Sequence, residues 1–164
     1  MLLDLKEVFQ NEGLQKQVDY SLSMNDIELD GVYPFKTPVN ICALSVNRAS
    51  LVDLEIKVNF LYTRNCDRCF EEYSREMNYT FKHKLAVTLA DDENDDYIET
   101  PDYKLELDDL VISDIILNLP SKNLCKEDCK GLCQKCGKNL NEGDCNCDKR
   151  QVDSRLEILK ELIN

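Results

Sequence analysis

Residues 125–147 read CKEDCKGLCQKCGKNLNEGDCNC, and this stretch holds six of the nine cysteines in the 164-residue chain. Lysine, glycine, asparagine and acidic residues fill most of the positions between the cysteines. Such a segment has too few apolar side chains to fold by burying them, so its folding energy must come from another source. Metal ions held by thiolates are one such source.

The rest of the chain indicates a protein that keeps its thiols reduced. The formal net charge is −12, and no stretch approaches the 18 or more apolar residues of a membrane helix. The first residues, MLLDLKEVFQNEG, lack the apolar region of a signal peptide. We therefore expect a cytoplasmic protein without a membrane partner, in which cysteines serve as metal ligands or redox thiols rather than disulfides.

The best-defined ligand set is Cys133, Cys136, Cys145 and Cys147, with the spacing C-x2-C-x8-C-x-C. Four thiolates complete the tetrahedral shell of a structural zinc ion and leave no open position for catalysis. Gly137 follows the first pair and permits the positive φ that turns backbone N–H groups toward the sulfurs. The pattern predicts one zinc ion here.

A second, less complete pattern consists of Cys66 and Cys69, spaced C-x2-C, with Cys125 and Cys129, spaced C-x3-C. These four could form another zinc site that joins a hairpin tip to the start of the cysteine-rich stretch. They could also be reduced thiols or a partial site. Spacing alone does not decide how eight thiols are divided, so a second zinc ion is possible.

The other metal-binding residue types have simpler interpretations. Cys42 shares a strand face with Leu44 and Val46, and we interpret it as a small buried apolar residue. His83 lies on the apolar face of its strand, as a half-buried core residue would. The C-x3-C-x2-C spacing of 129–136 is similar to that of radical SAM enzymes, but too few residues follow to build their barrel.

Alternating side chains predict two long antiparallel strands. Val52, Leu54, Ile56, Val58 and Phe60 alternate with polar residues, and the same period recurs over 77–89. Together they form a hairpin with CDRC, residues 66–69, near its tip. Shorter strands are expected over 18–22 and 39–47.

Three helices are expected, over 2–12, 110–119 and 152–163. Asp108 would cap the second helix, and Pro120 would end it. The predicted fold class is α+β: a mainly antiparallel sheet or barrel with short helices, residues 1–120, then a cysteine-rich zinc-binding segment with a closing helix, residues 121–164.

Acidic residues concentrate in 91–114, where eleven Asp or Glu accompany a single Lys. Asp91, Asp92, Glu93, Asp95 and Asp96 begin this segment and form a candidate surface for a basic partner. A solvated loop is the alternative. The sequence has no phosphate-binding glycine loop and no hydrolase motif, so we expect neither an enzyme nor a small-molecule substrate.

The motifs together resemble the YceD family, the large ribosomal RNA subunit accumulation proteins, in its Gram-positive form. The resemblance rests on LKEVFQNEG (5–13), CDRC (66–69), LNLP (117–120), the stretch 125–147 and DSRLEILKELI (153–163). Gln134 departs from the family, which more often has proline there. The resemblance implies a non-enzymatic factor that assists large-subunit rRNA accumulation, processing or ribosome assembly.

Charge limits the partner that such a factor can bind. A chain of charge −12 gains little from the counterion release that drives phosphate binding, so we expect weak binding to naked RNA. A basic ribosomal protein or a large-subunit precursor particle fits better. The alternative function is a redox-regulated chaperone, which zinc-thiolate motifs of this kind also resemble, although this chain is shorter and its motif order is reversed.

Overall fold

A computed structural model describes residues 1–49, 51–88 and 97–147, which fall into two compact units. The first comprises Met1–Arg64 and Glu72–Asn123. The second comprises Asn65–Glu71 together with the chain from Leu124 onward. The loop of the long hairpin is therefore grouped with the cysteine-rich segment and not with the strands on either side of it.

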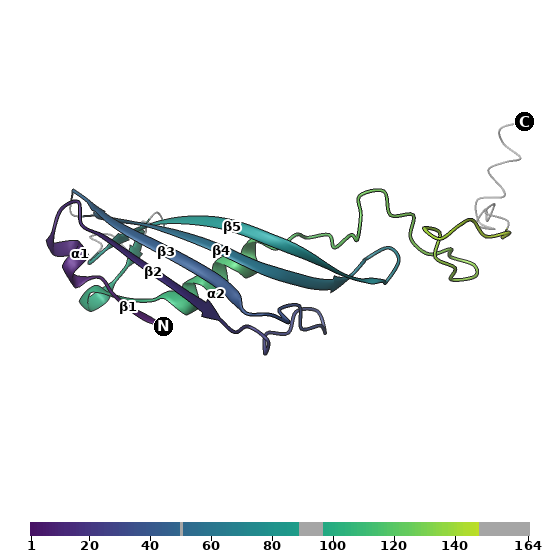
Figure 1. Ribbon diagram of the computed structural model, residues 1–164, viewed down its shortest axis with the longest axis horizontal. Coiled ribbons are helices and arrows are strands. Elements are labelled where there is room, and N and C mark those ends of the chain that lie inside the picture. The colour runs from purple at the N-terminus through teal and green to yellow at the C-terminus, as the bar shows by residue number, and fades with distance from the viewer. Residues whose placement is uncertain (50, 89–96, 148–164) are drawn as a thin grey trace, which may run out of the picture. The chain divides into compact units, whose positions relative to one another are not determined.

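A five-stranded sheet in the order β2-β3-β4-β5-β6 forms the first unit (Figure 1). Its strands are β2 (Gln15–Leu22), β3 (Val39–Arg48), β4 (Leu51–Asn65), β5 (Glu72–Ala86) and β6 (Tyr97–Glu99). The β2–β3 and β3–β4 pairs are antiparallel, with Ile41 opposite Tyr20 and Val58. The mainly antiparallel sheet is as expected, except that β6 pairs with β5 in parallel.

The two longest strands follow the predicted alternation. Every even-numbered residue of β4 from Val52 to Tyr62 is buried, and its odd-numbered neighbours up to Leu61 are half-buried or exposed. In β5 exposed and half-buried residues alternate from Glu76 to Lys84. The hairpin prediction is confirmed, and both strands are 15 residues long.

The amino-terminal segment differs from the predicted helix over 2–12. Its first residues form β1 (Leu2–Asp4), which pairs antiparallel with β7 (Lys104–Glu106) in a two-stranded sheet. The helix α1 covers only Lys6–Gln10. Pairing with a distant strand satisfies the backbone of Leu2–Asp4, an option that local helical spacing cannot reveal.

One face of the sheet carries the core, which also includes Met24, Phe35, Leu107, Val111 and Ile115. On β3 the core residues are the odd-numbered ones, such as Ile41 and Ala43. Cys42 lies on the opposite face and is half-buried, so the prediction of a buried Cys42 is wrong. Asp19 accepts a hydrogen bond from Cys42, and this contact raises the pKa of the Cys42 thiol.

The helix α2 (Leu107–Asn118) lies along one face of the sheet (Figure 1). It ends where Pro120 predicts, because Leu119 is extended with φ −62° and ψ 147°. Asp108 does not cap it: the helix begins at Leu107, before Asp108, and its N-cap residue is Glu106.

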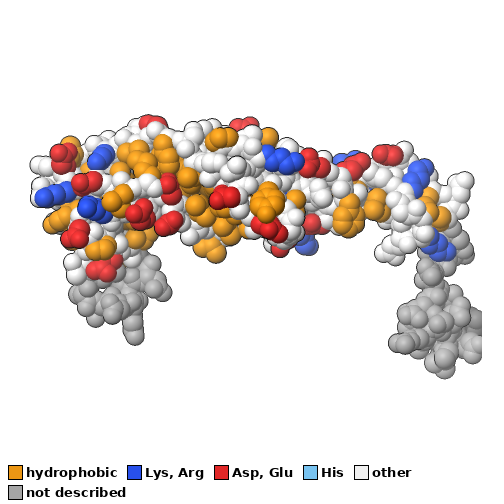
Figure 2. Space-filling view, turned by 90° about the horizontal axis from the view of Figure 1, so that it is seen from below, with side chains coloured by type: hydrophobic (Ala, Val, Ile, Leu, Met, Phe, Trp, Pro, Cys, Tyr) orange, Lys and Arg blue, Asp and Glu red, His pale blue; other side chains and the backbone are white. Residues whose placement is uncertain are grey.

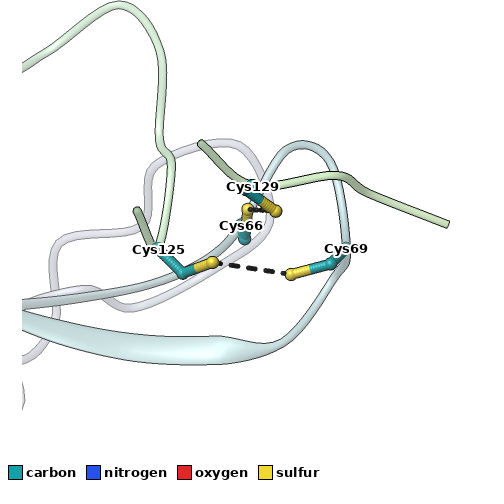
Figure 3. Close-up of side chains that lie close together, drawn as sticks. All are labelled: Cys66, Cys69, Cys125 and Cys129. Carbon is teal, nitrogen blue, oxygen red and sulfur yellow. Dashed lines mark hydrogen bonds between the residues drawn. The ribbon is translucent and has the colours of Figure 1, made fainter. Parts of the chain in front are cut away.

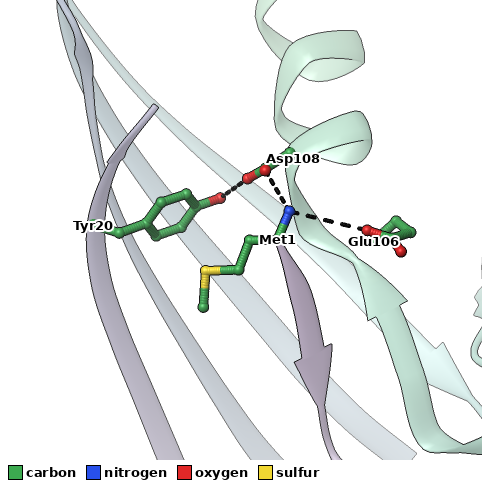
Figure 4. A network of polar contacts seen from close by, with 4 residues as sticks. All are labelled: Met1, Tyr20, Glu106 and Asp108. Atoms are coloured by element: carbon green, nitrogen blue, oxygen red, sulfur yellow. Dashed lines mark hydrogen bonds and ion pairs between the residues drawn. The ribbon is translucent and has the colours of Figure 1, made fainter. Parts of the chain in front are cut away.

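Asp108 instead takes part in a polar network (Figure 4). Its carboxylate accepts a hydrogen bond from Tyr20 Oη at 2.7 Å and another from the amino group of Met1. Burial alone would raise the pKa of Asp108, but these two donors outweigh it and lower the pKa. The Asp108 side chain, predicted to cap α2, thus links α2 to β2 and to the amino group of Met1.

His83 is half-buried, as expected, and its Nε2 lies 2.7 Å from Asp114 Oδ2 on α2. Two predicted features, the acids at 91–96 and the helix over 152–163, lie outside the described residues. None of the helices within the described ranges is long and apolar enough to cross a membrane.

Candidate metal centre

The hairpin loop and the cysteine-rich segment contain two turns of the same construction. In the first, Cys66 N–H donates to Glu71 O at 2.9 Å, and Phe70 N–H donates to Cys66 O at 2.9 Å. The first cysteine of each turn thus bonds to residues four and five positions later. Phe70 has φ 60°, in the left-handed region.

The second turn repeats this pattern 67 positions later. Cys133 N–H donates to Lys138 O at 2.9 Å, and Gly137 N–H donates to Cys133 O at 2.8 Å. Gly137 has φ 71°, the positive value expected from the sequence, and matches Phe70 in the first turn. Each C-x2-C pair therefore lies in a tight turn of the same hydrogen-bond pattern.

The first turn meets Cys125 and Cys129 (Figure 3). The Cys66 and Cys129 sulfurs are 3.7 Å apart, as are those of Cys69 and Cys125. All four lie within 4.8 Å of one another. Three of these cysteines are buried, and Cys125 is half-buried.

The second turn gathers the other quartet. The sulfurs of Cys133, Cys136, Cys145 and Cys147 also lie within 4.8 Å of one another. Cys136 is exposed, so this quartet is more open to solvent than the first. Within the described residues these two quartets are the groups whose geometry suits a metal ion.

The spacing of the sulfurs fits a tetrahedral zinc ion. Zinc–sulfur bonds of about 2.3 Å at tetrahedral angles place neighbouring sulfurs about 3.8 Å apart. The observed 3.7 Å agrees with that edge length. An iron–sulfur cluster contains several metal and sulfide atoms between its thiolates and needs a wider arrangement.

Thiolates are favoured at one cysteine of each turn. Burial opposes ionisation of Cys66, but backbone N–H groups of Cys125, Arg68 and Cys69 outweigh it and lower its pKa to about 6. Backbone N–H groups of Cys136 and Lys135 likewise lower the pKa of Cys133 to about 6.

Two other sulfurs, those of Cys69 and Cys147, resist ionisation beside these thiolates. Burial raises the pKa of Cys69 to about 12, and a hydrogen bond with Cys136 raises that of Cys147 to about 12. Like charges this close cannot all form unaided. A divalent cation removes the conflict, because it deprotonates the thiols that bind it.

Polar contacts outside the cysteines complete the first quartet, and no motif in the sequence predicted them. Arg68 Nη1 donates to Cys129 O at 2.8 Å, which holds the hairpin loop against the segment after Leu124. Asn141 Nδ2 donates to Cys129 Sγ at 3.3 Å and is the largest cause of the lowered pKa of Cys129. Neither contact has a spacing signal, because each joins residues more than ten positions apart.

Gly131 allows the closest approach between the loop and that segment. Its φ is +74°, and a Cβ there would lie 2.9 Å from Arg68 O. Leu132 N–H donates to the same carbonyl at 3.0 Å. A side chain at position 131 would therefore push the hairpin loop away from the segment that contains Gly131.

Comparison with known proteins assigns the chain to a family. A family model described as "Large ribosomal RNA subunit accumulation protein YceD" matches residues 54–163, which include both cysteine quartets. The chain belongs to the YceD family.

A curated YceD relative supports the assignment. The chain is 27% identical over 151 residues to the "Large ribosomal RNA subunit accumulation protein YCED homolog 1, chloroplastic" of Arabidopsis thaliana. The match covers 74% of this chain and 47% of that protein, so the chain spans about half the length of this relative. No solved structure matches the chain.

Proposed function

We propose that each cysteine quartet binds one zinc ion and that zinc holds the second unit together. The observation that carries this is the sulfur geometry: in each quartet four thiols lie within 4.8 Å of one another. Two sulfur pairs of the first quartet are 3.7 Å apart, where a tetrahedral zinc site needs about 3.8 Å. Zinc supplies folding energy at such a site, and the chain's own backbone donors hold the thiolates in place.

Single cysteine variants test this proposal. Cys69→Ser and Cys136→Ser should each lower the zinc content by one ion per chain, measured by native mass spectrometry of reduced protein. Cys42→Ser is the matched control and should keep the full content, because Cys42 lies on β3 outside both quartets. Full zinc content in the two quartet variants would show that the ligands are other residues.

We further propose that the chain is a non-enzymatic factor that assists the accumulation of large-subunit ribosomal RNA, in processing or assembly. Membership of the YceD family supports this function. Large-subunit rRNA should fall in cells that lack the protein and return when the wild-type chain is supplied. If the rRNA level is unchanged by loss of the protein, the proposed function is wrong.

The proposed partner is a basic ribosomal protein or a large-subunit precursor particle. The face shown in Figure 2 has acidic and basic side chains interspersed, without a broad basic patch to hold RNA. The segment that begins with Asp91, Asp92, Glu93, Asp95 and Asp96 supplies the strongest local negative charge and suits a basic partner.

Charge neutralisation tests that partner. Replacing those five acids by amides should weaken co-sedimentation with precursor particles, and salt should weaken the wild-type association steeply. The control neutralises five acids elsewhere that are exposed: Glu7, Glu12, Asp26, Glu127 and Asp128. Equal losses in both variants, or tight binding of the wild type to naked rRNA, would overturn the proposed surface.

A redox-regulated chaperone is the second candidate function, and the exposure of Cys136 favours it. Peroxide attacks thiolates that solvent can reach, and the second quartet is the more open of the two. In that case oxidised, zinc-free protein should suppress aggregation of an unfolded client, and reduced protein should not. The ribosome function predicts that peroxide adds no activity.

A further inference from the structure

One residue connects the two cysteine quartets. Asn141 lies in the loop between Cys136 and Cys145, and therefore belongs by sequence to the second quartet. Its side chain nevertheless donates to the sulfur of Cys129, a member of the first quartet, at 3.3 Å. The loop that the second quartet closes thus supplies a donor to a ligand of the first.

The Asn141 side chain is fixed on both sides. Its Oδ1 accepts a hydrogen bond from Lys130 N–H at 2.9 Å, next to Cys129. Its Nδ2 also lies 2.9 Å from Asn139 Oδ1, and its own N–H donates to that oxygen at 3.0 Å. With the amide held this way, Nδ2 points to the sulfur of Cys129.

The same loop has further contacts with the first quartet's surroundings. Leu140 N–H donates to Gly131 O at 2.9 Å, and Leu132 pairs with Asn139 in an isolated antiparallel bridge. Asn139 Nδ2 donates to Glu71 Oε1 at 2.9 Å, which reaches the hairpin loop. Residues 139–141 therefore contact both chain segments that carry the first quartet.

We propose that metal binding at the two quartets is positively coupled through residues 137–144, and that Asn141 is the positioning residue that carries the coupling. The proposal rests on the proposed zinc sites. Metal at Cys133, Cys136, Cys145 and Cys147 closes the loop at both ends and orders it. The ordered loop places the Asn141 amide against Cys129, stabilises that thiolate and strengthens the first site.

Thermodynamic linkage makes the effect reciprocal. If metal at the second quartet raises the metal affinity of the first by some factor, metal at the first quartet raises the affinity of the second by the same factor. Loss of a hydrogen bond to a metal ligand lowers metal affinity about 10- to 100-fold. Partly loaded protein should then be scarce, because a chain with one zinc ion binds the next more tightly.

The test is a zinc titration of the full chain against a competing chelator, followed by native mass spectrometry. The wild type should pass from zero to two zinc ions with little of the one-zinc form. Asn141→Ala and Asn141→Asp should both accumulate the one-zinc form and bind the first-site ion about 10-fold more weakly. Glu142→Ala, an exposed neighbour in the same loop, is the control and should match the wild type.

A double-mutant cycle separates coupling from a local packing effect. Cys145→Ser with Cys147→Ser removes the second site and should weaken the first about as much as Asn141→Ala does. Adding Asn141→Ala to that double variant should then change little. If the two losses of first-site affinity instead multiply, Asn141 acts on Cys129 independently of the second metal, and the proposed coupling is wrong.

Cobalt provides a readout that packing alone would not move. In Co²⁺-loaded protein, Asn141→Ala should shift the thiolate-to-metal charge-transfer absorption, because the Cys129 sulfur loses an N–H donor. An unchanged spectrum would remove Asn141 from the site. A wild-type chain that binds no metal would instead overturn the proposed function itself, so the two failures are distinguishable.

Discussion

The two units of this chain are stabilised by different means. The first buries a continuous apolar cluster from Leu3 to Ile115, with Phe35, Phe60 and Leu54 among its fully buried side chains. In the described part of the second, the buried apolar side chains are four cysteines: Cys66, Cys69, Cys129 and Cys133. One chain thus combines a hydrophobic core with a unit whose buried side chains are cysteines, and the two should fail under different conditions.

Metal removal should produce the largest difference between the units. A structural zinc site contributes about 10–16 kcal/mol, so a strong chelator should unfold 65–71 and 124–147. The strands β2 to β5 should keep their protection, because their core contains no ligand. Amide hydrogen exchange with and without chelator measures both regions at once, and equal loss of protection in the sheet would contradict the comparison.

A cavity in the hydrophobic core should destabilise the first unit and leave the second unit's metal in place. Ile56 on β4 is fully buried, and Ile56→Ala should cost about 2–5 kcal/mol in the free energy of unfolding. Zinc content should remain at the wild-type value. Urea denaturation gives the first quantity and native mass spectrometry the second, with the exposed neighbour variant Lys57→Ala as control.

A matched glycine pair sharpens the comparison inside the second unit. Gly131→Ala and Gly137→Ala carry a similar backbone penalty, since φ is +74° and +71°. Only the Cβ at 131 meets backbone, 2.9 Å from Arg68 O. Gly131→Ala should therefore cost about 1–3 kcal/mol more. The measurement is the resistance of 124–147 to proteolysis at a fixed chelator concentration. Equal losses of resistance in the two variants would show that the close approach of Gly131 to Arg68 is unimportant.

The smallest effect concerns the polar network of Asp108. Asp108→Asn should cost about 1–2 kcal/mol in unfolding free energy near pH 6, since hydrogen bonds to a partly exposed charged group are worth that much. Because its folded pKa is lowered, this stability is present above about pH 4 and disappears as pH falls through the folded pKa.

Titration of the Met1 amino group sets the upper pH limit of the stabilisation by this network. Its hydrogen bond to Asp108 raises the pKa of the Met1 amino group, so its contribution is full below about pH 8 and is lost above the raised value. The wild-type minus Asp108→Asn difference, measured by urea denaturation from pH 3 to 10, should fall at both ends. A difference that does not vary with pH would exclude the charged network.

Periodicity predicted the parts of the fold that are long and half-buried. Residues 52–60 and 77–85 alternate over enough positions that one face must be buried. Residues 2–4 and 104–106 are only three residues each, and their pairing depends on a partner 100 to 104 positions away. The strand β6 was missed because it is also only three residues long. The role of Asp108 was missed because Tyr20 and Met1 lie far from it in the sequence.

The cysteines show the same limit in the candidate site. Spacing grouped Cys133, Cys136, Cys145 and Cys147 because they are close in sequence. The second group could only be suggested, because Cys69 and Cys125 lie 56 positions apart in the sequence. Asn141 could not be predicted, since an amide that donates to a distant sulfur has no pattern in the sequence.

The central claim is that metal, and not apolar burial, holds the second unit together. Native mass spectrometry of reduced wild-type protein, purified without added metal, tests it most directly. We predict two zinc ions on each chain. A chain that carries no metal, yet whose residues 124–147 resist proteolysis as well as the sheet does, would contradict the account.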